Sequence, residues 1–191
     1  MKKILLIGCG HMGSSLLSAW IKSQKYIITV ADPHTYKTLK KKYKNKNLKV
    51  VKAIQELKII DFNFIVLAIR PFDLQNILNQ LQILKLDKKV SIVSIIAGKK
   101  IDVIKNKFIK NRNIFRVMPN IPASIGESMN CVVASTTSST LMKNEIIKLF
   151  SFSGKTILLK NEDQIDMTTA ISGSGPGFVF NIIDAMEKAA I

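Results

Sequence analysis

The sequence predicts an α/β fold: a doubly wound parallel sheet followed by the start of an all-α domain. Short apolar runs alternate with helical segments over the first 160 residues, and two further helical segments follow, up to residue 191. The runs are apolar throughout rather than at every second position, which is typical of parallel strands that are buried on both faces. The segments between them are long enough for crossover helices, so a βαβ arrangement follows.

The expected strands and helices follow from these runs in chain order. Strands are predicted at residues 3–7, 27–30, 48–51, 64–69, 90–96 and 114–118, and two more, at 131–134 and 156–159, extend the sheet at one edge. Helices are predicted at residues 12–24, 73–84, 139–150, 164–171 and 179–191. Four apolar residues of the first helix share one face: Leu16, Leu17, Trp20 and Ile21. We expect Asp73 to be the N-cap of the second helix.

The composition indicates a folded protein with a sizeable core and an excess of basic residues. Of the 191 residues, 47% are hydrophobic, and the formal net charge is +16. A charge of this sign can attract nucleic acid or an anionic membrane. The lysines are scattered, however, with one tight run at residues 40–42 and no interleaved aromatic residues. We therefore interpret the charge as compositional drift and expect no nucleic-acid or membrane partner.

The cysteines and the apolar segments bear on the compartment. Cys9 and Cys131 lie far apart without metal-binding spacing, which favours reduced thiols and predicts no metal site. The first apolar run stops at Gly8, which is too short for a secretory signal, and no stretch reaches the roughly 18 apolar residues of a membrane span. We expect a soluble, cytoplasmic protein.

A glycine-rich motif follows the first predicted strand and opens the first predicted helix. Gly8 allows a tight turn, Gly10 lets backbone N–H groups approach a pyrophosphate, and Gly13 lets the helix pack closely against the strand. This context predicts a Rossmann-like, dinucleotide-binding domain over residues 1–160, and a glycine turn without a ligand is the alternative. The residues that we assign to the cofactor here are Ile7, Gly8, Cys9, Gly10, His11, Met12 and Gly13.

Asp32 follows the glycines at the end of the second predicted strand. An acidic side chain about 20 residues beyond the motif typically accepts hydrogen bonds from the ribose 2′-hydroxyl of NAD and repels a 2′-phosphate. The alternative is that Asp32, which precedes Pro33, starts a turn or caps the next helix. His34 or Lys37 could also offset its charge. We assign Asp32 to the cofactor site and leave the choice between NADPH and NADH open.

Three turns follow the fourth, fifth and sixth predicted strands: Arg70 with Pro71, Ala97 with Gly98, and residues 118–122. In open α/β sheets ligands lie at the carboxyl ends of the strands, so we expect these turns to line the path from ribose to nicotinamide. For each turn alone, ordinary loop chemistry is the alternative. The residues that we add to the cofactor site are Ala68, Ile69, Arg70, Pro71, Ile95, Ile96 and Ala97.

A second glycine-bearing segment, residues 172–175, precedes Pro176 near the end of the chain. It presents unencumbered backbone N–H groups and two hydroxyls, and Pro176 suits the first turn of a following helix. Such a segment at a helix N-terminus is well suited to a carboxylate. A plain flexible turn is the alternative, because Ser–Gly runs are frequent in linkers.

Together these motifs resemble the pyrroline-5-carboxylate reductase family, the last enzyme of proline synthesis. The resemblance runs nearly end to end, and residues 116–123 and 169–176 are its most specific parts. It implies an oxidoreductase that uses NADPH or NADH, a small-molecule substrate in 1-pyrroline-5-carboxylate, and homo-oligomers in the family. It also implies that the Ser–Gly segment holds the substrate carboxylate.

The resemblance further implies a set of substrate-binding residues: Asn120, Glu162, Ser172, Gly173, Ser174 and Gly175. Glu162 matches an acidic position that the family keeps near the substrate. No side chain is an obvious proton donor, and Ser174 and Glu162 are the catalytic candidates. Arg70 stands where the family usually has Lys, and Ile121 where it usually has Thr. Asp32 stands where the family often has a small polar residue, which favours NADH more than the family default does.

Family members continue for several more helices that form an intertwined dimer, whereas this chain ends within the first of them. We therefore expect residues 161–191 to be the incomplete start of an α-helical substrate and dimerisation domain, with an apolar surface that needs cover. Two alternatives stay open. One is an inactive remnant that retains dinucleotide binding, and the other is a different imine or 2-hydroxyacid reductase with the same N-terminal domain.

Overall fold

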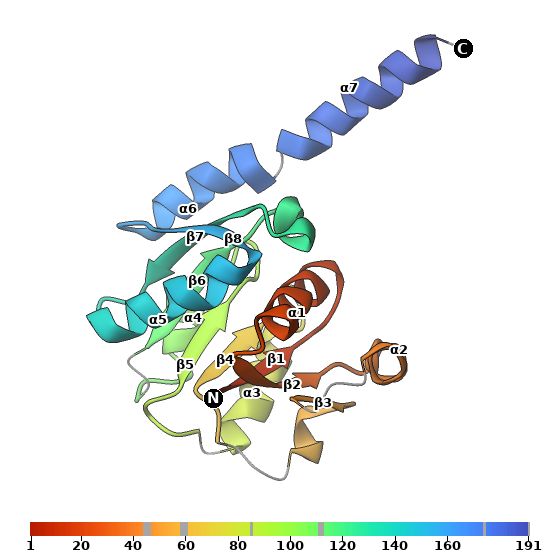
Figure 1. Ribbon diagram of the computed structural model, residues 1–191. Helices are drawn as coiled ribbons and strands as arrows, with labels where there is room; N and C mark the ends of the chain where they lie inside the picture. The colour runs from red at the N-terminus through yellow and green to blue at the C-terminus, as the bar shows by residue number, and fades with distance from the viewer. Residues whose placement is uncertain (44–46, 58–60, 85, 111–112, 174, 191) are drawn as a thin grey trace.

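The computed structural model describes residues 1–43, 47–57, 61–84, 86–110, 113–173 and 175–190. In these parts of the chain eight strands form one sheet, in the order β3-β2-β1-β4-β5-β6-β7-β8 (Figure 1). The strands are β1 Lys2–Ile7, β2 Tyr26–Ala31, β3 Leu48–Val51, β4 Phe64–Leu67, β5 Ser91–Ser94, β6 Ile114–Met118, β7 Ser128–Ala134 and β8 Gly154–Leu158. The order of β1 to β6 reverses between β1 and β4, which confirms the predicted doubly wound architecture.

Helices cover both faces of this sheet. They are α1 His11–Ser23, α2 Tyr36–Lys42, α3 Leu74–Ile83, α4 Ile101–Lys105, α5 Thr140–Phe150, α6 Glu162–Thr168 and α7 Gly175–Ala189, with 3₁₀ turns η1 Ile54–Glu56, η2 Ile121–Ile125 and η3 Ser151–Ser153 and a π-helical turn η4 Thr169–Gly173. Helices α1, α2 and α5 share one apolar layer, which contains Trp20 and Phe150. Helices α3, α4 and α6 share the other, which contains Leu78 and Ile165.

The apolar runs of the sequence are explained by these two layers. In β1, Leu5 faces the α3 layer and Leu6 faces the α1 layer, and both side chains are fully buried. Successive side chains of a strand point to opposite faces, so a strand that is covered on both sides is expected to be apolar at most positions. The same holds for the four residues of β4, all of which are buried.

One strand direction differs from the predicted parallel sheet. β7 runs antiparallel to β6, whereas β8 is parallel to β7. The link from β6 to β7, residues 119–127, holds only η2, and a parallel crossover needs about a dozen residues or more. The chain therefore returns beside β6 in the opposite direction.

Most element boundaries agree with the predictions, and a few differ. β4 and β5 end at Leu67 and Ser94, two residues before the predicted ends. Helices α2 and α4 had no predicted counterpart, and α7 begins at Gly175 rather than at residue 179. Asp73 is the N-cap residue of α3, as expected, but its side chain makes no capping hydrogen bond.

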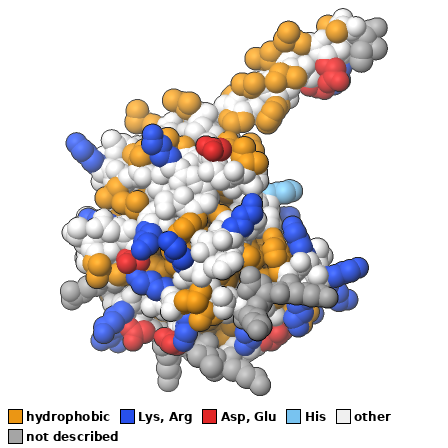
Figure 2. Space-filling view, in the orientation of Figure 1, with side chains coloured by type: hydrophobic (Ala, Val, Ile, Leu, Met, Phe, Trp, Pro, Cys, Tyr) orange, Lys and Arg blue, Asp and Glu red, His pale blue; other side chains and the backbone are white. Residues whose placement is uncertain are grey.

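The C-terminal segment leaves the body of the molecule. Helix α6 lies on the sheet through the buried Ile165, whereas α7 extends outward (Figure 1). Apolar side chains follow this projecting helix in Figure 2, and those of Phe178, Phe180 and Ile182 are exposed. Within the described ranges no helix has the length and apolar character that crossing a membrane requires.

Candidate functional site

The glycine-rich turn joins β1 to α1, and its three glycines have different surroundings. Gly8 has φ +87°, and a Cβ atom there would collide with the carbonyl oxygen of Ala68. A Cβ atom on Gly13 would lie 2.6 Å from the Gly8 carbonyl oxygen. A Cβ atom on Gly10, the N-cap of α1, would meet nothing within 4 Å. Gly8 and Gly13 are thus required by the fold, whereas no protein atom fills the space beside Gly10.

Asp32 links this turn to the end of β2. One carboxylate oxygen, Oδ2, accepts a hydrogen bond from the Cys9 N–H at 2.6 Å. The other, Oδ1, accepts from the N–H groups of His34 and Thr35 at 2.8 and 2.7 Å. The turn-forming role that was the alternative for Asp32 is therefore present in the structure. The same residue also lines the cleft described below, and its role at the cofactor stays a prediction.

The Asp32 carboxylate is 6% exposed and is nevertheless held in its charged form. Burial by itself raises the pKa of this group, but the hydrogen bonds from the backbone N–H groups of Thr35, Cys9 and His34 outweigh it. Its pKa is consequently below the ordinary value for an aspartate.

This lowered pKa predicts a pH dependence of stability. The charged form is favoured by folding, so its contribution is present above the unfolded-state pKa of about 4 and is lost as pH falls through the lower folded-state value. We expect wild type to be more stable than Asp32→Asn near neutral pH, with the difference shrinking below about pH 4. Urea unfolding of both proteins across this range measures it. A difference that stays constant with pH would contradict the assignment.

A cleft of about 770 Å³ opens at the carboxyl ends of the strands, beside the glycine-rich turn. It brings together many predicted cofactor residues from three separate segments: Ile7, Gly8, Cys9, Gly10, Asp32, Ala68, Ile69 and Arg70. Other predicted residues do not line it: His11, Met12, Gly13, Pro71, Ile95, Ile96 and Ala97. For both groups of residues, the assignment to the cofactor stays a prediction.

The cleft also has walls that the sequence did not indicate. Lys52 and Gln55 line it from the end of β3 and from η1, and Phe72, Asn76 and Gln80 line it from the region of α3. The position of β3 beside β2 was the available signal, because the carboxyl ends of neighbouring strands meet at one edge of a sheet. The polar residues of α3 belong to no motif and could not be distinguished from an ordinary solvated helix face.

Cys9 lies in the same turn, and its backbone N–H donates the hydrogen bond to Asp32 described above. Its side chain is buried, and burial, followed by the nearby Asp32 charge, raises the pKa of the thiol to about 12. A neutral thiol is neither a strong nucleophile nor a metal ligand. Among the described residues no three His, Cys, Asp or Glu side chains form a group that could hold a metal ion.

The predicted substrate residues lie around α6 and η4. Ser172 and Gly173 belong to the π-helical turn, where Ser172 Oγ donates to the Thr168 carbonyl oxygen at 2.9 Å. Gly175 opens α7, and Ser174 lies outside the described residues. Ser172 and Gly173 are thus helical rather than part of the open loop that was expected.

Two further predicted residues are engaged with the protein itself. Asn120 Oδ1 accepts hydrogen bonds from Ser128 Oγ at 3.0 Å and from the Met129 N–H at 2.9 Å, which fixes the turn after β6. Glu162 Oε1 accepts from the Ile101 N–H at 3.0 Å and lies 3.3 Å from Arg116 Nη1. Roles for Asn120 and Glu162 at the substrate stay predictions.

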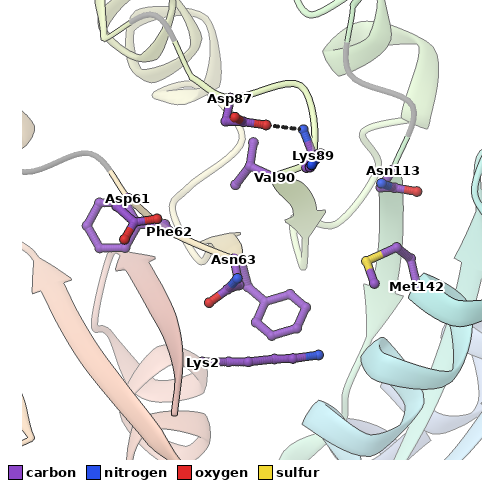
Figure 3. A pocket seen from close by; sticks show the side chains of 10 residues that line it. Lys2, Asp61, Phe62, Asn63, Asp87, Lys89, Val90, Asn113 and Met142 are labelled. Atoms are coloured by element: carbon purple, nitrogen blue, oxygen red, sulfur yellow. Dashed lines mark hydrogen bonds between the residues drawn. The ribbon is translucent and has the colours of Figure 1, made fainter.

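A second hollow, of about 440 Å³, lies at the opposite edge of the sheet, where β1, β4 and β5 begin (Figure 3). Lys2 crosses it, with its ammonium group 2.5 Å from Glu145 and over the Phe64 ring. Asp87 Oδ1 accepts a hydrogen bond from the Lys89 backbone N–H within the adjoining turn. The Lys2 ammonium is thus paired with Glu145, and none of the predicted site residues lines this hollow.

The glycine-rich turn, the acidic residue at the end of β2 and the cleft beside them define a Rossmann-type dinucleotide-binding protein. Two family models match the chain. Residues 3–98 match "NADP oxidoreductase coenzyme F420-dependent", and residues 162–191 match "Pyrroline-5-carboxylate reductase dimerisation".

Similar proteins agree with these matches. Pyrroline-5-carboxylate reductase 2 of Bacillus subtilis is 31% identical over all of this chain and 68% of its own length. The structure of a pyrroline-5-carboxylate reductase from Coxiella burnetii has a TM-score of 0.82 at 26% identity, over 98% of this chain and 69% of that one. That of the Plasmodium falciparum enzyme with NADP bound has a TM-score of 0.79 at 25% identity, over 99% and 69%. The chain belongs to the pyrroline-5-carboxylate reductase family.

Proposed function

We propose that this protein reduces 1-pyrroline-5-carboxylate to L-proline with NADPH or NADH, the last step of proline biosynthesis. The observation that carries the proposal is a cleft of a size that suits a nucleotide, beside the glycine-rich turn, in a chain that resembles reductases along its whole length. The NADP bound to the Plasmodium relative supports this class of cofactor. A cytoplasmic location stays a prediction from the two free cysteines.

In the proposal, residues 1–160 bind the dinucleotide, and residues 161–191 belong to a substrate and dimerisation domain. The match of residues 162–191 to a dimerisation model supports a separate substrate and dimerisation part, which begins where Asn161 caps α6. The exposed apolar side chains of α7 support assembly with another chain. In the proposed assembly, as in the family, this part contributes to a homo-oligomer.

The residues around the glycine-rich turn fit a dinucleotide. The space beyond Gly10 is open, and no acidic residue in the first turn of α1 compensates the positive end of the helix, so a pyrophosphate is favoured there. Asp32 has the position and the charge to accept ribose hydroxyls. When bound, the reduced nicotinamide supplies the hydride.

The substrate would be held by residues 172–175. Helix α7 also has no acidic residue in its first turn, and its N-terminus follows directly on these residues, so the helix favours a carboxylate there. The protein's part in catalysis is orientation and electrostatics, which can supply most of the rate enhancement of such a transfer. We assign no general acid, and the catalytic roles of Ser174 and Glu162 stay predictions.

A reductase assay tests the proposal. Purified protein is mixed with 1-pyrroline-5-carboxylate and NADPH or NADH, and oxidation of the cofactor is followed by absorbance. Gly10→Trp is the control, because its side chain would extend into the open space beyond Gly10 while the turn keeps its backbone. Turnover by wild type above this control supports the proposal. Cofactor binding without turnover would instead indicate a dinucleotide-binding remnant, and turnover of 2-hydroxyacids would indicate a different reductase.

Asp32 predicts a preference for NADH within this function. A buried, charged carboxylate at the ribose end of the cleft opposes a 2′-phosphate, and like charges in contact cost several kcal/mol. We expect Asp32→Ser to shift the ratio of NADPH to NADH affinity toward NADPH by roughly tenfold or more. Fluorescence titration of both cofactors measures the ratio. Asp73→Ser, which removes another carboxylate of the cleft, is the control, and an equal shift in both variants would contradict the role of Asp32.

A further inference from the structure

Arg116 is a buried cation in the middle of the sheet. It lies on β6 between the neighbouring strands β5 and β7, and its side chain is 3% exposed. A buried guanidinium must be paired, because removing its charge from water is strongly unfavourable. Nε is buried without a hydrogen-bond partner among the described residues, so the charge is compensated through the two outer nitrogens.

Both partners of Arg116 belong to α6. Nη1 lies 3.3 Å from Glu162 Oε1, and Nη2 lies 2.8 Å from Asp166 Oδ1. The two carboxylates stand four residues apart on one face of the helix, where they would repel each other without a cation between them. Glu162 Oε1 also accepts the N–H of Ile101, the first residue of α4. One guanidinium thus joins β6 to α6, and Glu162 extends the connection to α4.

The position of α6 determines the position of the segment that follows it. Thr169 Oγ1 donates to the Ile165 carbonyl oxygen at 2.7 Å, and Ser172 Oγ donates to that of Thr168 at 2.9 Å. These bonds join η4 to α6 as a continuous helical unit that ends at Gly173. A displacement of α6 would therefore move the Ser–Gly segment with it.

We infer that Arg116 is a positioning residue, which fixes α6 on the sheet and thereby places Ser172 and Gly173 for the substrate. Glu162 supports this placement through Arg116 and the Ile101 N–H, in addition to its predicted role at the substrate. The functional half of this inference rests on the proposed reductase function. The structural half does not, because it concerns how firmly α6 is held.

The experiment compares Asp166→Asn with Asp163→Asn in the full chain. The Asp166 side chain is 53% exposed, so its replacement leaves the core intact. Asp163 is an exposed acid on the same helix and forms no ion pair with the other described residues. Both substitutions remove one negative charge from α6. Only Asp166→Asn removes a negative charge that pairs with Arg116.

We expect Asp166→Asn to accelerate amide hydrogen exchange in residues 162–173 but not in β1 or α1, and Asp163→Asn to leave both unchanged. Misplacement of reacting groups by about 1 Å can cost roughly 100-fold in rate, so a loss of roughly 10- to 100-fold in kcat/KM is expected for Asp166→Asn. Cofactor affinity should stay at the wild-type value. Arg116→Met should raise hydrogen exchange and lower kcat/KM more than Asp166→Asn does. Arg116→Lys should have smaller effects than Arg116→Met, because lysine keeps the positive charge but lacks the planar guanidinium that contacts two carboxylates.

The outcomes separate the two proposals. Equal exchange rates in Asp166→Asn and Asp163→Asn would overturn the positioning role, whatever the activity. A parallel loss of cofactor affinity would also overturn it, because the effect would then extend to the whole fold. A wild-type chain without turnover would refute the proposed function, and the exchange comparison would still decide whether Arg116 holds α6.

Discussion

Replacing Gly8 by alanine is expected to lower the free energy of unfolding by about 2–4 kcal/mol. The residue has φ +87°, and the new methyl group would collide with the Ala68 carbonyl oxygen at the start of the neighbouring turn. Neither the left-handed backbone nor the contact can relax without separating β1 from β4, which are paired up to Ile7 and Leu67. Urea unfolding followed by the fluorescence of Trp20, the one tryptophan of the chain, measures the change.

Gly10→Ala is the matched control for this prediction. Its methyl group meets no protein atom within 4 Å but lies at the cleft, so stability should stay near the wild-type value while the affinity for NADPH or NADH falls. The two substitutions together distinguish Gly8, which the folded backbone requires, from Gly10, which we expect cofactor binding to require. Equal destabilisation by the two substitutions, or undiminished cofactor affinity of Gly10→Ala, would contradict this division.

Trp20→Ala is expected to destabilise the protein by about 3–5 kcal/mol. The side chain is fully buried between α1 and α5, its ring meets that of Phe150 edge to face at 6.0 Å, and Nε1 donates to the Leu149 carbonyl oxygen at 2.9 Å. Because α1 carries the glycine-rich turn at its N-terminus, loosening this contact should also weaken cofactor binding. Urea unfolding followed by circular dichroism gives the stability, and titration with the cofactor gives the affinity.

The conservative control is Trp20→Phe. It keeps an aromatic ring in the core and removes the hydrogen bond and part of the volume, so we expect a loss of about 1–2 kcal/mol. If both substitutions cost the same, the hydrogen bond to Leu149 would be the dominant contribution. If neither lowers cofactor affinity, α1 is positioned independently of its contact with α5.

Local patterns were sufficient for the central part of the fold. The continuous apolar runs predicted β1 to β6 because strands between two helical layers are mostly apolar. Ser91 and Ser94 of β5 and Arg116 of β6 are buried exceptions. The direction of β7 was missed because an apolar run looks the same in either direction, and its pairing is decided by the short link after Met118. Helix α2 was not predicted, because Leu39 is its one buried residue and the helix therefore has no apolar stripe.

The candidate site was predictable where its chemistry is concentrated in a motif. The glycine-rich turn and Asp32 could be found because their spacing follows from the geometry of one βαβ unit. The Arg116 contacts could not, because Glu162 lies 46 residues away in the sequence and only the folded sheet brings the charges together. For the same reason, nothing in the sequence indicated that Asp32 would accept the Cys9 N–H as well as those of its own turn.

The most direct test of the proposed function is the fate of the hydride. The purified chain is supplied with NADPH or NADH carrying two deuterium atoms at C4 of the nicotinamide, together with 1-pyrroline-5-carboxylate, and the product is analysed by mass spectrometry. The account predicts L-proline that carries one deuterium, at the carbon of the former C=N bond. The Gly10→Trp control should produce no labelled proline. Proline without the label, or no proline while the cofactor still binds, would contradict the proposal that this chain is a reductase.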